Sequence, residues 1–323
     1  MFLRDYLPAL RYGAKITSQD CEGVGSFDRF FSTNVWYVDG TNGSDTLQGD
    51  FDHPFATIQK AIDSASRQDT IYVRALHPDT DASDSGQYVE NLTIPFALDG
   101  LKIIGVGSSG GRLPYYGPKI KNASAGALLT VNAAGVHLEG LQFNATRNSG
   151  TYGILLDAEA TGTAYDTKAG SVGFTIVNCM IKNGDATYGG IYIVGGYGGL
   201  ISHCTFQGCL MGITIPSNVI PCNGHTIEWC NFKNINGATA TSHIKTSAGG
   251  NHDITIDHCN FDLGTNLIYI GDANTGTISN CCFHDTSATL ANSTGLVRVP
   301  AAQTMTVTGC WGGVSLAVIQ SAA

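Results

Sequence analysis

Two acidic residues, Glu228 and Asp257, form the pair in this sequence with the best spacing for catalysis. Each follows an isoleucine at the same position of a recurring phrase, on two successive repeats. Adjacent strands lie about 4.8 Å apart, and a general acid and a nucleophile that cleave a glycosidic bond with retention stand about 5–5.5 Å apart. The equivalent positions in the other repeats are Glu139, Val177, Ser202, Ser279 and Thr308. We therefore interpret the pair as part of a solvent-facing strip, with catalysis as the alternative.

A second outward strip contains side chains suited to binding. Lys245, Tyr269 and Arg298 are expected on consecutive repeats after Tyr192 and Thr214. A cation, an aromatic ring and another cation at this spacing can stack. This strip could contact a glycan or the acidic face of a partner subunit, and we favour the subunit.

Other polar residues give weaker signals. The residues Gly224-His225 and His243-Ile-Lys-Thr246 faintly resemble motifs of polygalacturonase-type hydrolases, but the aspartate motifs of that family are missing. The loop from Asp39 to Asp45 contains oxygen ligands without the alternating carboxylates of an EF-hand, which favours a turn network over calcium. We expect no metal, no cofactor and no catalytic residue.

A repeated six-residue phrase predicts the elements that position these side chains. It occupies residues 138–143, 176–181, 201–206, 227–232, 256–261, 278–283 and 307–312. Its fourth position recurs 38 residues after the first copy and then every 22 to 29 residues. A period of this size indicates a solenoid.

Each phrase is typical of a strand that ends, bends once and continues as another strand. The bend is expected at Gly140, Asn178, His203, Trp229, His258, Asn280 and Gly309. Six of these seven are Gly, Asn or His, which tolerate positive φ best, and Trp229 is the exception. A third strand follows at 154–156, 191–193, 213–215, 244–246, 268–270, 297–299 and 314–316. Three short strands per turn predict an all-β fold, a single-stranded right-handed parallel β-helix.

The fourth position of the phrase predicts a column of cysteines inside the β-helix. Its members are Cys179, Cys204, Cys230, Cys259, Cys281 and Cys310. Their Cβ vectors would run parallel, whereas a disulfide needs a torsion near 90°. We therefore expect free thiols that pack as small apolar groups. The state of Cys21, Cys209, Cys222 and Cys282 stays open.

Two segments precede the repeats. Residues 54–66 carry apolar residues at helical spacing and predict a short capping α-helix, with Asp52 as N-cap and proline in the first turn. Residues 1–34 are interpreted as an anchoring arm before a β-helix of residues 35–323. The arm is rich in large apolar side chains: Phe2, Leu3, Tyr6, Leu7, Leu10 and Tyr12.

Four runs near the start of the β-helix support a family resemblance. They are Tyr37-Val-Asp-Gly-Thr-Asn-Gly-Ser-Asp45, His53-Pro-Phe-Ala-Thr-Ile-Gln-Lys-Ala-Ile62, Asp69-Thr-Ile-Tyr-Val73 and Tyr88-Val-Glu-Asn-Leu-Thr-Ile94. In these runs the chain resembles pectate-lyase-like right-handed β-helix proteins, which include bacteriophage tailspikes, other virion surface proteins and secreted polysaccharide-cleaving enzymes. The resemblance implies the fold, whereas one fold supports many activities.

Composition restricts the partners. Only 13% of the 323 residues are charged and the net charge is −9, which argues against duplex nucleic acid and anionic membranes as partners. Arg4 and Asp5 interrupt the apolar start, so we expect no secretory signal and synthesis in a reducing cytoplasm.

These observations lead to one prediction with two alternatives. The prediction is a virion structural protein, a capsid decoration or spike, made in the host cytoplasm and displayed on the virion surface. We expect a homotrimer that is held by residues 1–34 to capsid or other virion proteins. The alternatives are a tailspike-like polysaccharide depolymerase that uses Glu228 and Asp257, and a non-catalytic module that binds host glycan through Tyr192, Lys245, Tyr269 and Arg298.

Overall fold

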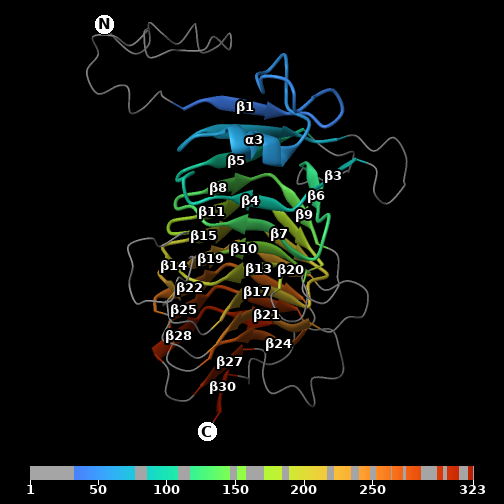
Figure 1. Cartoon of the computed structure of the whole chain (residues 1–323). Coiled ribbons are helices and arrows are strands. Elements are labelled where there is room, and N and C mark those ends of the chain that lie inside the picture. Colours follow the sequence, from blue (N-terminus) through green and yellow to red (C-terminus); the bar gives the residue numbers. More distant parts are fainter. Residues whose placement is uncertain are drawn as a thin grey trace, which may run out of the picture.

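The chain forms a rod of stacked coils, which runs from β1 at one end to β30 at the other in a computed structural model (Figure 1). The structure describes residues 33–76, 86–107, 117–145, 151–157, 171–183, 189–216, 222–233, 240–247, 252–262, 264–271, 274–284, 297–300, 304–312 and 319–322. Within them, every strand pairing is parallel. The strands make three long sheets, here named A, B and C, and one two-stranded sheet.

From β2 onward, each coil contributes one strand to each long sheet in the order A, B, C, and β1 adds a further strand to sheet A. Sheet A consists of β1 (Val35–Val38), β2 (Thr70–Arg74), β5 (Lys102–Val106), β8 (His137–Glu139), β11 (Thr175–Val177), β15 (Leu200–Ser202), β19 (Thr226–Glu228), β22 (Ile254–Asp257), β25 (Thr275–Ser279) and β28 (Thr304–Thr308). Sheet B consists of β3 (Gln87–Val89), β6 (Lys119–Lys121), β9 (Gln142–Asn144), β12 (Met180–Lys182), β16 (Thr205–Gln207), β20 (Asn231–Lys233), β23 (Asn260–Asp262), β26 (Cys282–His284) and β29 (Trp311–Gly312).

Sheet C consists of β4 (Leu92–Ile94), β7 (Gly126–Val131), β10 (Thr151–Leu156), β13 (Ile191–Ile193), β17 (Met211–Ile215), β21 (Ala240–Thr246), β24 (Gly264–Tyr269), β27 (Val297–Pro300) and β30 (Ile319–Ala322). The small sheet pairs β14 (Gly196–Tyr197) with β18 (Cys222–Asn223).

In β30 the residue that pairs with Val297 is Ile319. The sequence predicted residues 314–316 as the strand that follows 297–299 in this sheet. That alignment is wrong, and residues 314–316 lie outside the described part.

The core consists of like side chains in register on successive coils. In sheet B, Phe206, Phe232 and Phe261 stack with ring centroids 4.5 and 4.8 Å apart and nearly parallel planes. In sheet A, Ile227 pairs with Ile256 on the next coil, and both are fully buried. Because strands alternate inward and outward side chains, one apolar residue in two is enough to fill the interior of each coil.

The bends between sheets A and B occur where the sequence predicts them. The φ angle is +53° at His203, +51° at Trp229 and +47° at His258. Gly140, Asn178, Asn280 and Gly309 also have positive φ. This conformation turns the chain in one residue. Even Trp229 adopts it, although a bulky side chain rarely does.

The cysteine column is confirmed as a ladder of free thiols. Cys179, Cys204, Cys230, Cys259 and Cys281 are buried, and Cys310 is partly buried. Cys230, for example, donates to the carbonyl oxygens of Glu228 at 3.2 Å and of Ile201, one coil away, at 3.7 Å. Burial raises the pKa of Cys230 well above its usual range. Cys209, Cys222 and Cys282 are also free and buried, and Cys21 lies outside the described part.

A short helix covers the first coils, as expected, but it begins later than the sequence suggests. Helix α3 spans Ile58–Ser64, and its N-cap is Thr57, whose hydroxyl accepts from the N–H of Lys60. The prediction of Asp52 as N-cap is wrong, because the helix begins only at Ile58, and Phe55 forms an isolated bridge with Val38 of the strand β1. Ile58 and Ile62 are buried against the core.

Candidate functional site

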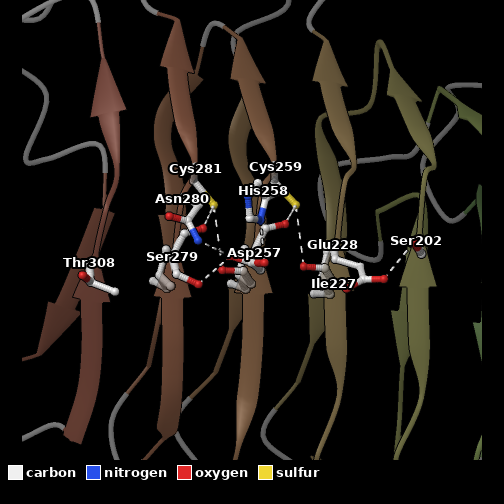
Figure 2. A network of polar contacts seen from close by, with 12 residues as sticks. Ser202, Ile227, Glu228, Asp257, His258, Cys259, Ser279, Asn280, Cys281 and Thr308 are labelled. Atoms are coloured by element: carbon white, nitrogen blue, oxygen red, sulfur yellow. Dashed lines mark hydrogen bonds and ion pairs between the residues drawn. The ribbon is translucent and has the colours of Figure 1, made fainter.

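The paired acids lie next to each other but do not face each other. Glu228 in β19 pairs in register with Asp257 in β22. Glu228 accepts a hydrogen bond from Ser202 on the preceding coil, with Oγ to Oε1 at 3.1 Å. Asp257 accepts from Ser279 on the following coil, with Oγ to Oδ1 at 2.6 Å. Figure 2 shows the two carboxylates reaching toward opposite neighbouring coils. The adjacency in register is confirmed, whereas the carboxylates do not converge on one point.

Asp257 is held as an anion. Partial burial raises its pKa, but hydrogen bonds from Ser279, His258 and Asn280 outweigh burial and keep the pKa below its usual range. His258 Nδ1 lies 2.6 Å from Oδ2, and Asn280 Nδ2 lies 3.1 Å from Oδ1. A general acid needs a raised pKa to keep its proton at neutral pH. This network therefore suits a structural carboxylate better than a proton donor.

An aromatic stack follows the corner between sheets A and B. The indole of Trp229 lies between two imidazoles, 4.2 Å from His258 and 6.1 Å from His203 by ring centroids, with interplanar angles of 17° and 19°. Trp229 is 49% exposed. The ring of Trp229 separates His203 from His258, and both histidines have the positive φ expected of bend residues. The positive φ at Trp229 places the indole at this edge.

The strip on sheet C has the predicted register. Tyr192 pairs with Thr214, Thr214 with Lys245, Lys245 with Tyr269 and Tyr269 with Arg298. Tyr192 also lies 6.1 Å from the ring of Tyr152. Tyr192, Lys245 and Tyr269 are partly exposed, whereas Thr214 between Tyr192 and Lys245 is 4% exposed, so the outward strip is interrupted at that coil.

The histidines of the polygalacturonase-like motifs are part of the interior. His225 is 1% exposed, its ring stacks on Phe174 at 5.4 Å, and burial lowers its pKa to about 4. His243 is 2% exposed and its Nε2 donates to the carbonyl oxygen of Asp262 at 2.6 Å. Neither ring is placed to meet a substrate on the surface.

The loop that begins at Asp39 forms the turn network that the sequence favours. The Asp39 carboxylate accepts from the N–H groups of Thr41 and Asn42 and pairs with Arg74. Asp45 accepts from the N–H groups of Ala56 and Thr57. Within the described ranges, no group of three or more His, Cys, Asp or Glu residues could hold a metal ion. No described helix is long and apolar enough to span a membrane.

The sequence reasoning missed the outward column of sheet B. Lys121, Asn144, Lys182, Gln207 and Lys233 are paired in register on five successive coils. A polar hollow of about 420 Å³ lies at the end of this column that includes Lys233. The available signal was the polar residue one place after each inward residue of the sheet B strands.

The predicted anchoring residues cannot be placed on the structure. Phe2, Leu3, Tyr6, Leu7, Leu10 and Tyr12 belong to residues 1–32, which lie outside the described part. The side chain of Arg298 is likewise not described, although its backbone is. The anchoring arm therefore stays a prediction.

Comparison with known proteins agrees with this architecture. Residues 166–311, somewhat under half of the chain, match the family model of the right handed beta helix region. The match agrees with the right-handed parallel β-helix fold that the three parallel sheets define. No curated protein matches its sequence.

Several solved structures are similar at low identity. A rhamnogalacturonan lyase is 15% identical, with a TM-score of 0.46, and the match covers 78% of this chain and 68% of that one. An alginate lyase from Paenibacillus sp. str. FPU-7 is 14% identical, with a TM-score of 0.49 and coverage of 79% and 92%. The protein ORF18 of Geobacillus virus E2 is 15% identical, with a TM-score of 0.47, and the match covers 91% of this chain and 59% of that one.

Proposed function

We propose that the chain is a structural protein displayed on a virus particle, a rigid β-helix that presents binding surfaces and does not itself cleave glycans. The observation that carries the proposal is the arrangement of Glu228 and Asp257. Each is bonded to a different neighbouring coil, so the pair stabilises the stack of coils. This arrangement supports a scaffold rather than an acid and a nucleophile that act on one bond.

The free-thiol core gives independent support for assembly in a reducing compartment. Nine described cysteines are free, and eight of them are buried. Disulfides seldom persist in the cytoplasm, and virion proteins are made there before assembly. The proposed assembly is a homotrimer, with residues 1–34 bound to capsid or other virion proteins.

Particle association tests the proposed location. Antibodies against residues 35–323 should label gradient-purified particles from a culture that produces the protein, at a constant ratio to a capsid protein. Deletion of residues 1–34 should leave a folded protein that no longer copurifies with particles. A protein found only in the particle-free supernatant, or a deletion that assembles normally, would contradict the proposal.

A reducing-sugar assay on host surface polysaccharide tests the absence of cleavage. The wild type and Glu228→Gln should both release no more reducing ends than a heat-treated sample. An activity in the wild type that Glu228→Gln or Asp257→Asn abolishes would establish the depolymerase alternative instead.

The register on sheet C favours glycan binding as a second candidate function. Tyr192, Lys245 and Tyr269 are partly exposed in one register column, which the buried Thr214 interrupts between Tyr192 and Lys245, and the backbone of Arg298 continues the register. Such columns can stack on sugar rings and bind their polar groups. The combined change Tyr192→Ala/Tyr269→Ala should then abolish retention on host glycan, and unchanged retention would eliminate this candidate.

A further inference from the structure

The outer face of sheet A is apolar at one end of the rod and polar farther along. At the end that carries β1 and β5 (Figure 1), Tyr37 aligns with Tyr72, and Tyr72 aligns with Ile104 on the next coil. The same column then becomes acidic, because Glu139 is the residue that aligns with Ile104. Partly exposed apolar side chains that gather at one place mark a contact surface.

A groove lies over this apolar end of the sheet, and we call it the N-terminal groove. Its volume is about 470 Å³, and its apolar lining includes Tyr37, Tyr72, Phe51, Pro54 and Val106. The rings of Tyr37 and Tyr72 stack with centroids 5.8 Å apart, and Phe51 meets Tyr37 edge-on at 5.4 Å. Phe51 is nevertheless 75% exposed, and Val106 is also exposed. The groove therefore presents apolar side chains to water.

Hydrogen bonds hold the loop that carries Phe51. The carbonyl oxygen of Gly49 accepts from the N–H of Tyr37 at 2.8 Å, and the N–H of Gly49 donates to the carbonyl oxygen of His53 at 2.8 Å. Asp50 Oδ1 accepts from the N–H of His53 at 2.7 Å. The exposed ring is thus presented by an ordered turn, which lowers the entropy cost when a partner binds.

An ion pair forms the polar edge of the groove. Arg74 and Asp39 both line it and bind each other. The side chain of Arg74 is largely exposed, whereas that of Asp39 is buried. A guanidinium has five N–H donors, so Arg74 can hold Asp39 and also bind an acceptor that enters the groove. The chemistry of the groove suits an apolar segment that carries an acidic residue.

The arm of this same chain contains such a segment. Its first twelve residues include six large apolar side chains, Phe2, Leu3, Tyr6, Leu7, Leu10 and Tyr12, and Asp5 lies among them. Residues 13–34 connect this segment to β1, which lines the groove through Tyr37. A connection of this length spans up to about 70 Å when extended, so the segment can fold back. Tethering gives it an effective concentration on the order of millimolar at the groove, which favours it over an untethered second copy.

We propose that residues 2–12 bind the N-terminal groove of their own chain. The apolar side chains of this segment cover Phe51 and Val106, and Asp5 accepts a hydrogen bond from Arg74. The contact removes apolar side chains of the groove and of the arm from water together, which drives the binding. It belongs to the free protein, in which the groove stores the arm until the arm binds another protein.

Crosslinking in the full chain tests both the contact and its occupant. Leu7→Cys is combined with Val106→Cys in a chain that also carries Cys21→Ser, and a short bismaleimide joins the two thiols. The control pair is Leu7→Cys with Thr277→Cys, because Thr277 lies on the same sheet roughly 30 Å farther along the rod. We expect a product of monomer mass, with a yield at Val106 roughly tenfold above that at Thr277.

Proteolysis measures how well the groove protects the segment. Trypsin cleaves after Arg11, and Phe51→Asp places a charge on the wall of the groove. We expect this variant to be cleaved there roughly tenfold faster than the wild type, because cleavage follows the fraction of unbound arm. The matched control is Phe96→Asp, which alters another exposed phenylalanine away from the groove lining and should change the rate by less than about twofold. Circular dichroism establishes that both variants fold.

Three results would overturn the proposal. They are equal crosslinking at Val106 and Thr277, a crosslinked product of dimer mass only, and equal cleavage rates in Phe51→Asp and Phe96→Asp. The second result would identify a second copy of the chain as the occupant of the groove. None of these results bears on particle association, so this proposal and the proposed function can fail separately.

Discussion

Adjacent residues of one strand differ in this protein in how strongly packing restricts their type. In β20, Phe232 points inward and is fully buried, whereas Lys233 follows it on the outside and is exposed. The inward column repeats Phe206, Phe232 and Phe261 on three coils. The outward column changes from Gln207 to Lys233 between two of the same coils. Packing thus fixes the inner residue on each coil, and the outer residue is left to define the surface.

The outer faces also differ from one sheet to the next. Sheet A presents Glu228 and Asp257 bonded to neighbouring coils, and sheet B presents a column of lysines. The corner between them carries the stack centred on Trp229. One repeating interior therefore supports at least two faces of opposite charge. Three predictions test this contrast between interior and exterior.

The largest effect is expected in the interior. Phe232→Ala should lower the free energy of unfolding by about 3–5 kcal/mol, because it leaves a cavity between two stacked rings. The adjacent exterior change, Lys233→Ala, should alter it by less than about 0.5 kcal/mol. Denaturant unfolding in reducing buffer measures both. Similar losses in the two variants would show that the interior and exterior of β20 are not separated as described.

A smaller effect is expected at the carboxylate that bonds two coils. Asp257→Asn should cost on the order of 1 kcal/mol at neutral pH, because it removes charge-assisted hydrogen bonds. The folded pKa of Asp257 is lowered, so the unfolded state binds its proton more readily. The stabilisation is present above the unfolded pKa of about 3.9 and is lost as pH falls through the lower folded pKa.

The pH dependence provides the check on this assignment. Unfolding free energies of the wild type and Asp257→Asn should converge as the pH falls below about 4. Glu139→Gln, on the same outward column, is the control, because the Glu139 carboxylate contacts His137 in its own strand rather than another coil. A constant difference between wild type and Asp257→Asn at all pH values would mean that the charge of Asp257 does not stabilise the stack.

The smallest effect is expected at the corner. Trp229→Asn should change the unfolding free energy by less than about 1 kcal/mol, because relief of a left-handed backbone offsets the lost ring stacking. Trp229→Val should be clearly less stable than Trp229→Asn, because a β-branched residue tolerates positive φ poorly. Thermal melting compares the two. If both variants have the same melting temperature, the positive φ at residue 229 does not restrict which side chains are tolerated there.

The fold was predictable because its signals are local and repeated. Most coils repeat an inward apolar residue, a bend residue and a cysteine, so a repeat that is ambiguous by itself can be aligned with the others. Where repetition ended, prediction weakened. The N-cap of α3 proved to be Thr57 rather than Asp52, and Ile319 rather than Val314 aligns with Val297. Both lie at the ends of the repeat array, where no neighbouring copy constrains the alignment.

The sequence by itself determined the coil period, the bends and the column of free thiols, because these follow from backbone conformation and from the alternation of side chains along a strand. Only the tertiary structure decided that Glu228 and Asp257 bond to opposite neighbours and that His225 and His243 lie inside. Those outcomes depend on contacts between residues about one coil or more apart in the chain, and on side-chain rotamers that no local pattern specifies.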